Sequence, residues 1–244
     1  MSTPPQSQKR LFDVIRASRP VLFQNYFEGY EYSLTGTSFL CEFESNQFIV
    51  TAKHVLDGFD PEAICIPFHY ESREFLPYTC VCTPVSSDPE EVDKFDIAVL
   101  PIAQNFDETD LSGEGPFSLT VDTIEQTLEP GTHLVLRGFP DGTNKIDYDK
   151  NTIIREGTAF GATIVGPSII NGCTEIAFND LSECHSINGL SGSPVFSINS
   201  LIPPYKVRLA GMLLRGTKSS SRGHMLNARL VLGMIKAAAA QVFI

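Results

Sequence analysis

The most informative segment of the chain is Asn188-Gly189-Leu190-Ser191-Gly192-Ser193-Pro194-Val195-Phe196. It places one serine in a tight turn between two glycines, and the turn leads directly into an apolar strand. A serine hydroxyl attacks a carbonyl only when a base removes its proton and fixed donors stabilise the oxyanion. Gly189 lets the backbone bend so that amide N–H groups face the reacting carbonyl. The stretch therefore indicates a nucleophile, provided that the chain also supplies a base and a group that orients it.

Two further motifs supply those groups. Phe48-Ile49-Val50-Thr51-Ala52-Lys53-His54-Val55 is an apolar strand that runs into a histidine, and Phe95-Asp96-Ile97-Ala98-Val99-Leu100 carries an aspartate at the head of a strand of buried type. Such an aspartate is rarely buried without a partner, and a histidine ring N–H is a suitable one. The order His54, Asp96, Ser191 is one of three chain orders known for the Ser-His-Asp triad. An α/β-hydrolase would place the serine first.

On these motifs the chain resembles the trypsin-like serine peptidases of the chymotrypsin fold, of the bacterial, non-secreted type. Thr51-Ala52-Lys53-His54 is similar to that family's T-A-A-H, Asp96-Ile97-Ala98-Val99-Leu100 to its D-I-A-L-L, and Gly189-Leu190-Ser191-Gly192-Ser193-Pro194 to its G-D-S-G-G-P. Gly211-Met212-Leu213-Leu214-Arg215-Gly216 resembles the G-I-V-S-W-G strand that walls the substrate cleft. Each motif is weak alone, but four in the correct order are a strong signal.

The resemblance implies a serine endopeptidase that cleaves a protein or peptide substrate through an acyl-enzyme. His54 would take the proton of Ser191 and Asp96 would orient the imidazole, while the backbone N–H groups of Gly189 and Ser191 would form the oxyanion hole. Two other classes stay open. One is a catalytically idle module that binds a peptide or a partner protein, and the other is an esterase that uses the same residues.

The substrate pocket leaves two alternatives open. By the resemblance, His185 lies at the floor of the pocket for the residue before the cleaved bond, Gly223 and His224 match its far wall, and Leu214, Arg215 and Gly216 match its near wall. The aspartate that selects basic residues is absent from the floor. The cations His185, His224 and Arg215 would favour an acidic residue. The favoured alternative is that His185 points to solvent and the pocket is apolar.

Leu190 departs from the family pattern. It stands where secreted trypsins carry an aspartate that pairs with a newly cut amino terminus. No family-like new terminus precedes the first barrel, so we expect no cleavage-triggered switch. The oxyanion turn is then preformed or is set by another element, such as a regulatory protein partner or the amino-terminal helix.

Composition excludes several classes of function. The net charge of −11, from 29 acidic and 18 basic residues, argues against nucleic acid as a partner. The chain shows neither a secretory signal nor an apolar stretch long enough to span a membrane, so we expect a cytoplasmic protein without a membrane partner. Val55 stands where secreted trypsins carry a cysteine, which favours six reduced thiols over disulfides. Cys80-Val81-Cys82 lacks a second pair with zinc-ligand spacing, and we expect no metal and no cofactor.

Many short strands, with helical periodicity only near the ends, predict an all-β protein of two six-stranded antiparallel β-barrels in the chymotrypsin-like arrangement. A short helix is expected over residues 9–18 and a terminal helix over 226–241. The acidic, breaker-rich stretch 103–118 is the best linker candidate. The expected units are a helical extension over residues 1–20, a first barrel with His54 and Asp96 over 21–117, and a second barrel with Ser191 plus the terminal helix over 118–244.

Overall fold

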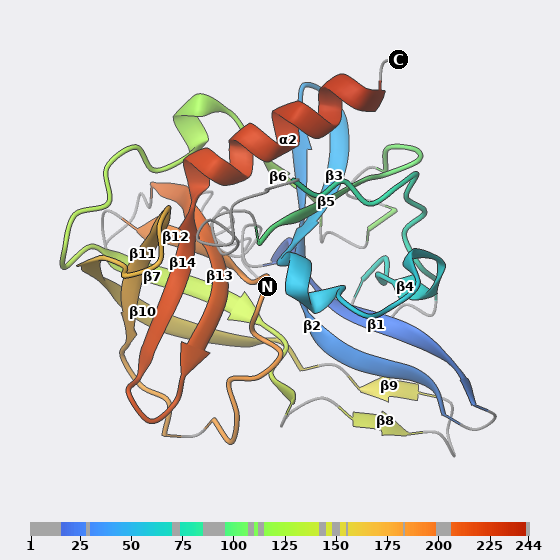
Figure 1. Ribbon diagram of the computed structural model, residues 1–244, viewed down its shortest axis with the longest axis horizontal. Helices are drawn as coiled ribbons and strands as arrows, with labels where there is room; N and C mark the ends of the chain where they lie inside the picture. The colour runs from blue at the N-terminus through green and yellow to red at the C-terminus, as the bar shows by residue number, and fades with distance from the viewer. Residues whose placement is uncertain are drawn as a thin grey trace, which may run out of the picture.

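The computed structural model has two β-sheets side by side and one long helix across them (Figure 1). The described residues are 16–27, 30–69, 74–84, 96–106, 110–111, 115–141, 145–147, 152–154, 156–182, 184–198 and 206–242.

The first sheet holds the amino-terminal strands in the order β4-β1-β2-β3-β5, and β6 pairs in parallel with β2. Its strands are β1 (Ser18–Phe27), β2 (Tyr30–Phe43), β3 (Asn46–Thr51), β4 (Ile64–Cys65), β5 (Ala98–Pro101) and β6 (Phe117–Ser118). Among the described residues this sheet curls without closing, since the stretch 74–82 contributes only single bridges such as Cys82 to Val99. The expected six closed, antiparallel strands are therefore replaced here by a half-barrel with one parallel pair.

The second sheet is a closed barrel of six antiparallel strands in the order β10-β11-β14-β13-β12-β7. Its strands are β7 (His133–Gly138), β10 (Thr158–Pro167), β11 (Cys173–Phe178), β12 (Pro194–Ile198), β13 (Val207–Thr217) and β14 (Arg222–Asn227). A separate hairpin of β8 (Lys145–Asp147) and β9 (Thr152–Ile154) lies below the first sheet in Figure 1. The predicted fold class, all-β with a chymotrypsin-like arrangement, is thereby confirmed, with one closed barrel and one half-barrel.

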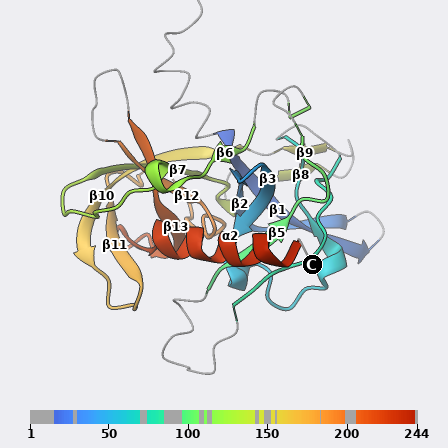
Figure 2. The ribbon, with the colours of Figure 1, turned by 90° about the horizontal axis from the view of Figure 1, so that it is seen from above.

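Helix α2 (Ala228–Val242) joins the two halves into one core. Its buried face, which includes Val231, Ile235 and Ala238, belongs to the same apolar cluster as Val99 of β5 and Met212 of β13. Figure 2 shows the helix running across both sheets. Burial of each large apolar side chain contributes on the order of 1.5–3 kcal/mol, so this helix fastens the two sheets in one relative position.

Two strands occupy residues that were expected to be helical. β1 begins at Ser18, where a helix over residues 9–18 was expected, and residues 9–15 of that helix lie outside the described residues. β1 also crosses the expected unit boundary at residue 20. β14 occupies residues 222–227, so the terminal helix begins at Ala228 rather than at 226. Three short 3-10 helices complete the described elements: η1 (Lys53–Val55), η2 (Pro61–Ala63) and η5 (Val121–Thr123).

Candidate active site

His54 stands on η1, immediately after the buried strand β3. The turn is anchored by Val55, which is only 4% exposed, while 40% of the His54 side chain is accessible. The backbone N–H of His54 donates to Asp96 Oδ1 at 2.9 Å, and its ring Nδ1 lies 2.6 Å from Asp96 Oδ2. One ring nitrogen is therefore held inside the protein, and the other edge of the ring is left for a second partner.

Asp96 is 6% exposed and lies two residues before β5. It reaches the histidine because β5 pairs antiparallel with β3, with Ala98 opposite Thr51. Both carboxylate oxygens point at His54, one to its backbone and one to its ring. A buried carboxylate with two such partners fixes the tautomer and the orientation of the imidazole.

Ser191 comes from the second half of the chain, but its backbone is hydrogen-bonded to the first sheet. Its carbonyl accepts from the Thr37 N–H at 2.9 Å. A Cβ atom built on Gly36 would lie 2.6 Å from Val55 Cγ1 and 3.2 Å from the Ser191 carbonyl oxygen. The histidine turn and the serine turn therefore both pack against Gly36 of β2, and the serine turn is also hydrogen-bonded to the next residue, Thr37. Within the described chain no hydrogen bond joins Ser191 Oγ to His54 Nε2, and such bonds are often loose without substrate.

The turn before Ser191 has a defined shape. The Leu190 N–H donates to the Ile187 carbonyl at 3.2 Å, and Gly189 has a φ of 87°. This is a type II turn, in which the third position needs a positive φ and hence favours glycine. A Cβ atom on Gly189 would also lie 2.5 Å from the Phe139 carbonyl oxygen. Both the conformation and the lack of space require glycine at this position.

The backbone amides of Gly189 and Ser191 are the candidate oxyanion donors of this turn, where Gly189 is buried and Ser191 is partly exposed. Neither donates a hydrogen bond to any described residue. The carbonyl of the Asn188–Gly189 peptide accepts from the Asp141 N–H at 2.9 Å, and the carbonyl of the Leu190–Ser191 peptide accepts from Ser193 at 3.0 Å. Because C=O and N–H point in opposite directions across a trans peptide, these bonds fix the direction in which the two free N–H groups point.

The residues expected to line the substrate pocket are divided between two faces of the β13–β14 hairpin. Gly216 pairs with Gly223, and Arg215 pairs with His224. Alternation along β14 places Gly223 inward and His224 on the other face, where its Nδ1 lies 2.9 Å from Ser168 Oγ.

The remaining two expected pocket residues lie in contrasting environments. His185 is exposed. Leu214 is fully buried in the core.

Apolar side chains that the sequence analysis did not single out fill the space beside the two glycines. A Cβ atom on Gly216 would lie 3.1 Å from Ile187 Cδ1 and 3.4 Å from Phe178 Cε2. On Gly223 it would lie 3.2 Å from the same Phe178 atom. Phe178 is 5% exposed at the end of β11. No sequence motif marks it, because its role depends on strand pairing across the barrel.

The described chain contains no group of three or more His, Cys, Asp or Glu side chains placed to hold a metal ion. Within the same residues, no helix has the length and apolar character needed to cross a membrane. Two surface cavities of about 300 and 400 Å³ lie on the second barrel, share Glu125, and are lined by none of the three triad candidates.

The fold has counterparts among solved structures. The chain is similar to a scabies mite inactivated protease paralogue, S-I1, with a TM-score of 0.61 and 16% identity, over 92% of this chain and 95% of that one. The chain has the chymotrypsin-like fold. An identity this low supports the fold alone, so the bacterial type and the non-secreted character stay predictions. No family model and no curated protein matches the sequence.

Proposed function

We propose that the chain is a serine endopeptidase with Ser191 as nucleophile, His54 as general base and Asp96 as the group that orients the base. The observation that carries the proposal is the pairing of His54 with Asp96, at 2.6 Å, together with a turn whose Gly189 and Ser191 amides donate to no described residue. Acyl transfer needs a nucleophile, a base, an orienting carboxylate and oxyanion donors, and the presence of a candidate for each supports the proposal.

The chemistry follows from these positions. His54 Nε2 accepts the Ser191 proton while Ser191 Oγ attacks the scissile carbonyl, and the imidazolium then gives that proton to the leaving amine. Asp96 keeps the Nδ1–H directed inward and stabilises the positive ring. Water, activated by the same histidine, attacks the acyl-enzyme and releases the acid. The protonation cycle is complete without a metal or a cofactor.

The oxyanion formed in each step would lie between the Gly189 and Ser191 amides. Donors that are already oriented cost no reorganisation at the moment of reaction. Loss of one such donor in other enzymes lowers kcat by about 10²- to 10³-fold. Both amides here belong to peptides whose carbonyls are held by other backbone groups, Asp141 N–H and Ser193 N–H. This supports a hole that exists before substrate arrives.

We further propose an apolar and shallow pocket for the residue before the cleaved bond. Phe178 and Ile187 approach the inward faces of Gly216 and Gly223. His224 is engaged by Ser168 on the other face of the hairpin, and His185 is exposed. These positions favour a small apolar residue over an acidic one, which was the competing alternative.

The second candidate is a catalytically idle module that binds a peptide or a partner protein. Two observations favour it. A structure with the same fold is described as an inactivated protease paralogue. In addition, no Ser191 Oγ–His54 Nε2 hydrogen bond is present in the described chain. The complete His54–Asp96 pair argues for the active enzyme, since an idle module has no use for a base that a buried carboxylate orients.

A cleavage profile tests the endopeptidase proposal. Purified protein is incubated with a peptide library prepared from a digested proteome, and new termini are identified by mass spectrometry. We expect cleavage after small apolar residues, which disappears with Ser191→Ala. Cleavage of ester substrates alone would replace the endopeptidase by an esterase. Equal cleavage by wild type and Ser191→Ala would contradict the proposal.

A further inference from the structure

We propose that Thr37 is a positioning residue for the oxyanion turn, an inference that rests on the proposed function. Thr37 lies on β2 of the first sheet and is fully buried. Its hydroxyl donates to the Gly189 carbonyl at 2.7 Å, and its backbone N–H donates to the Ser191 carbonyl at 2.9 Å. One residue thus holds the carbonyls on both sides of the Ser191 amide.

The direction of the Thr37 hydroxyl hydrogen is fixed by its other neighbour. The Phe139 N–H donates to Thr37 Oγ1 at 2.9 Å, so the oxygen acts as acceptor there. The single hydroxyl hydrogen is then directed at Gly189 O. The Thr37 carbonyl in turn accepts from Thr51 Oγ1 at 2.7 Å. The threonine is held from three sides before it acts on the turn.

With the Thr37 hydrogen bonds, each peptide between Asn188 and Ser191 is held by at least one hydrogen bond. The Gly189–Leu190 peptide donates through Leu190 N–H to Ile187 O and accepts through Gly189 O from Thr37. Its plane is therefore fixed at both ends. The free N–H groups of Gly189 and Ser191 flank this peptide, so its rotation would turn one or both of them away from a bound oxyanion.

Leu190 explains why such a device is required. Its side chain is 1% exposed and packs in the apolar core of the second barrel. A Cβ atom on Gly138 would lie 2.7 Å from Leu190 Cδ2. A buried leucine cannot order the turn through an ion pair. The neutral hydroxyl of Thr37 supplies the missing restraint from the opposite sheet.

The test uses the second-order rate of Ser191 phosphonylation by a fluorophosphonate, measured per folded molecule on full-length protein. Thr37→Val keeps the shape of the side chain and removes its hydroxyl. We expect the rate to fall by about 10- to 100-fold, below the loss of a hole donor itself. Thr37→Ser should restore it to within about threefold of wild type. With any cleaved peptide, Thr37→Val should lower kcat and leave KM unchanged.

Thr174→Val is the matched control, because it removes another buried hydroxyl, which donates to Asn227 Oδ1 at 2.7 Å in the second barrel. It should label at the wild-type rate. If Thr37→Val does not fold, Thr37→Cys keeps a weak donor and should label about three- to tenfold more slowly. Wild-type rates for folded Thr37→Val or Thr37→Cys, or a Thr37→Ser rate as low as that of Thr37→Val, would overturn the inference. An unlabelled wild type would instead refute the proposed function.

Discussion

Val55 packs against the backbone of Gly36, and the fit leaves no room for a methyl group. A Cβ atom on Gly36 would lie 2.6 Å from Val55 Cγ1 and 2.8 Å from Val55 Cγ2. Val55 is the residue after His54. Thr37, the residue after Gly36, donates its backbone N–H to the Ser191 carbonyl. This contact therefore sets the spacing between the base and the nucleophile.

Gly36→Ala should displace the histidine turn. We expect a loss of about 1–3 kcal/mol in unfolding free energy, as for other overpacked sites, together with reduced Ser191 reactivity. Val55→Ala makes room for the new methyl, so the double variant Gly36→Ala/Val55→Ala should recover part of both losses. Urea unfolding and phosphonylation rates of the wild type, the two single variants and the double variant give a double-mutant cycle. Strictly additive effects would contradict a direct contact.

Gly189→Ala should abolish reactivity, whereas Gly131→Ala should not. Both glycines have nearly the same positive φ, 87° and 85°, so alanine meets the same backbone strain at each. Only at Gly189 does the new Cβ also collide with the Phe139 carbonyl, since nothing lies within 4 Å at Gly131. Phosphonylation of Ser191 should drop at least about 100-fold in the first variant alone. Similar rates in both variants would remove the steric argument.

Ser193→Ala should leave stability unchanged or raise it slightly. Ser193 Oγ is buried and is the one such side-chain atom of the described residues that lacks a hydrogen-bond partner. Its replacement by a methyl removes a desolvated group without breaking a bond, so we expect a change between 0 and about +1 kcal/mol. Chemical denaturation measures it. A loss above about 1 kcal/mol would show that the hydroxyl has a partner in solution.

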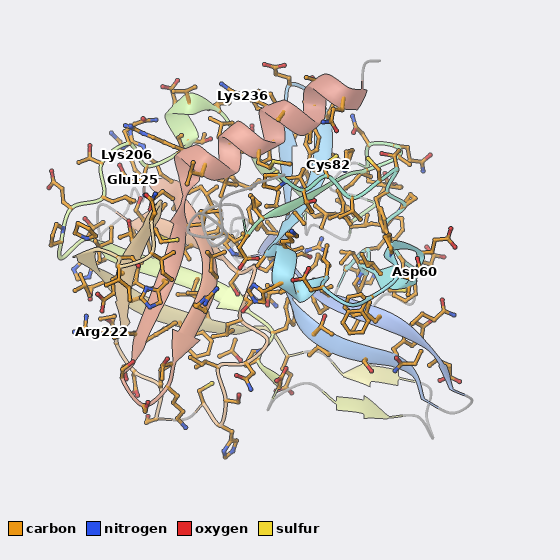
Figure 3. All side chains as sticks on the ribbon, viewed as in Figure 1. Asp60, Cys82, Glu125, Lys206, Arg222 and Lys236 are labelled. Carbon is orange, nitrogen blue, oxygen red and sulfur yellow. The ribbon has the colours of Figure 1, made fainter. Side chains whose placement is uncertain are left out.

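Cys80 should react first with iodoacetamide in the native protein. All six cysteines are free, and Cys80 alone is exposed. Burial raises the pKa of Cys65 and of Cys82 to about 11, so both are thiols at pH 8 and react slowly. Cys82 also lies beside the carboxyl end of α2, near Gln241 (Figure 3). Raising the pH from 8 towards 11 should accelerate the reaction at these two sites. Their modification before Cys80 at pH 8 would contradict the described burial.

The fold class and the triad candidates could be read from local motifs, because each motif joins a strand pattern to one polar residue. The amino-terminal strand β1 could not, since Pro20 and the helical periodicity before it obscured a strand that begins at Ser18. β14 was hidden because its residues were interpreted as a pocket wall and the start of the terminal helix.

The residues that position the candidate site, such as Thr37, could not be predicted from the sequence for a different reason. Thr37 and Gly189 are 152 residues apart, and nothing in Gly36-Thr37-Ser38 signals that the hydroxyl meets the oxyanion turn. Phe178 became relevant only when strand pairing placed it beside Gly216 and Gly223. Such contacts depend on tertiary packing, which local patterns do not encode.

The most direct test of the central claim is the site and state of fluorophosphonate labelling on full-length protein. We predict one adduct per chain on Ser191, formed while all 244 residues are present, because Leu190 cannot pair with a newly cut amino terminus. Ser191→Ala should take no label and His54→Ala should label on the order of 10⁴- to 10⁶-fold more slowly. Intact mass and peptide mapping give the answer. A folded wild type without an adduct, or an adduct found only on shortened chains, would contradict the account.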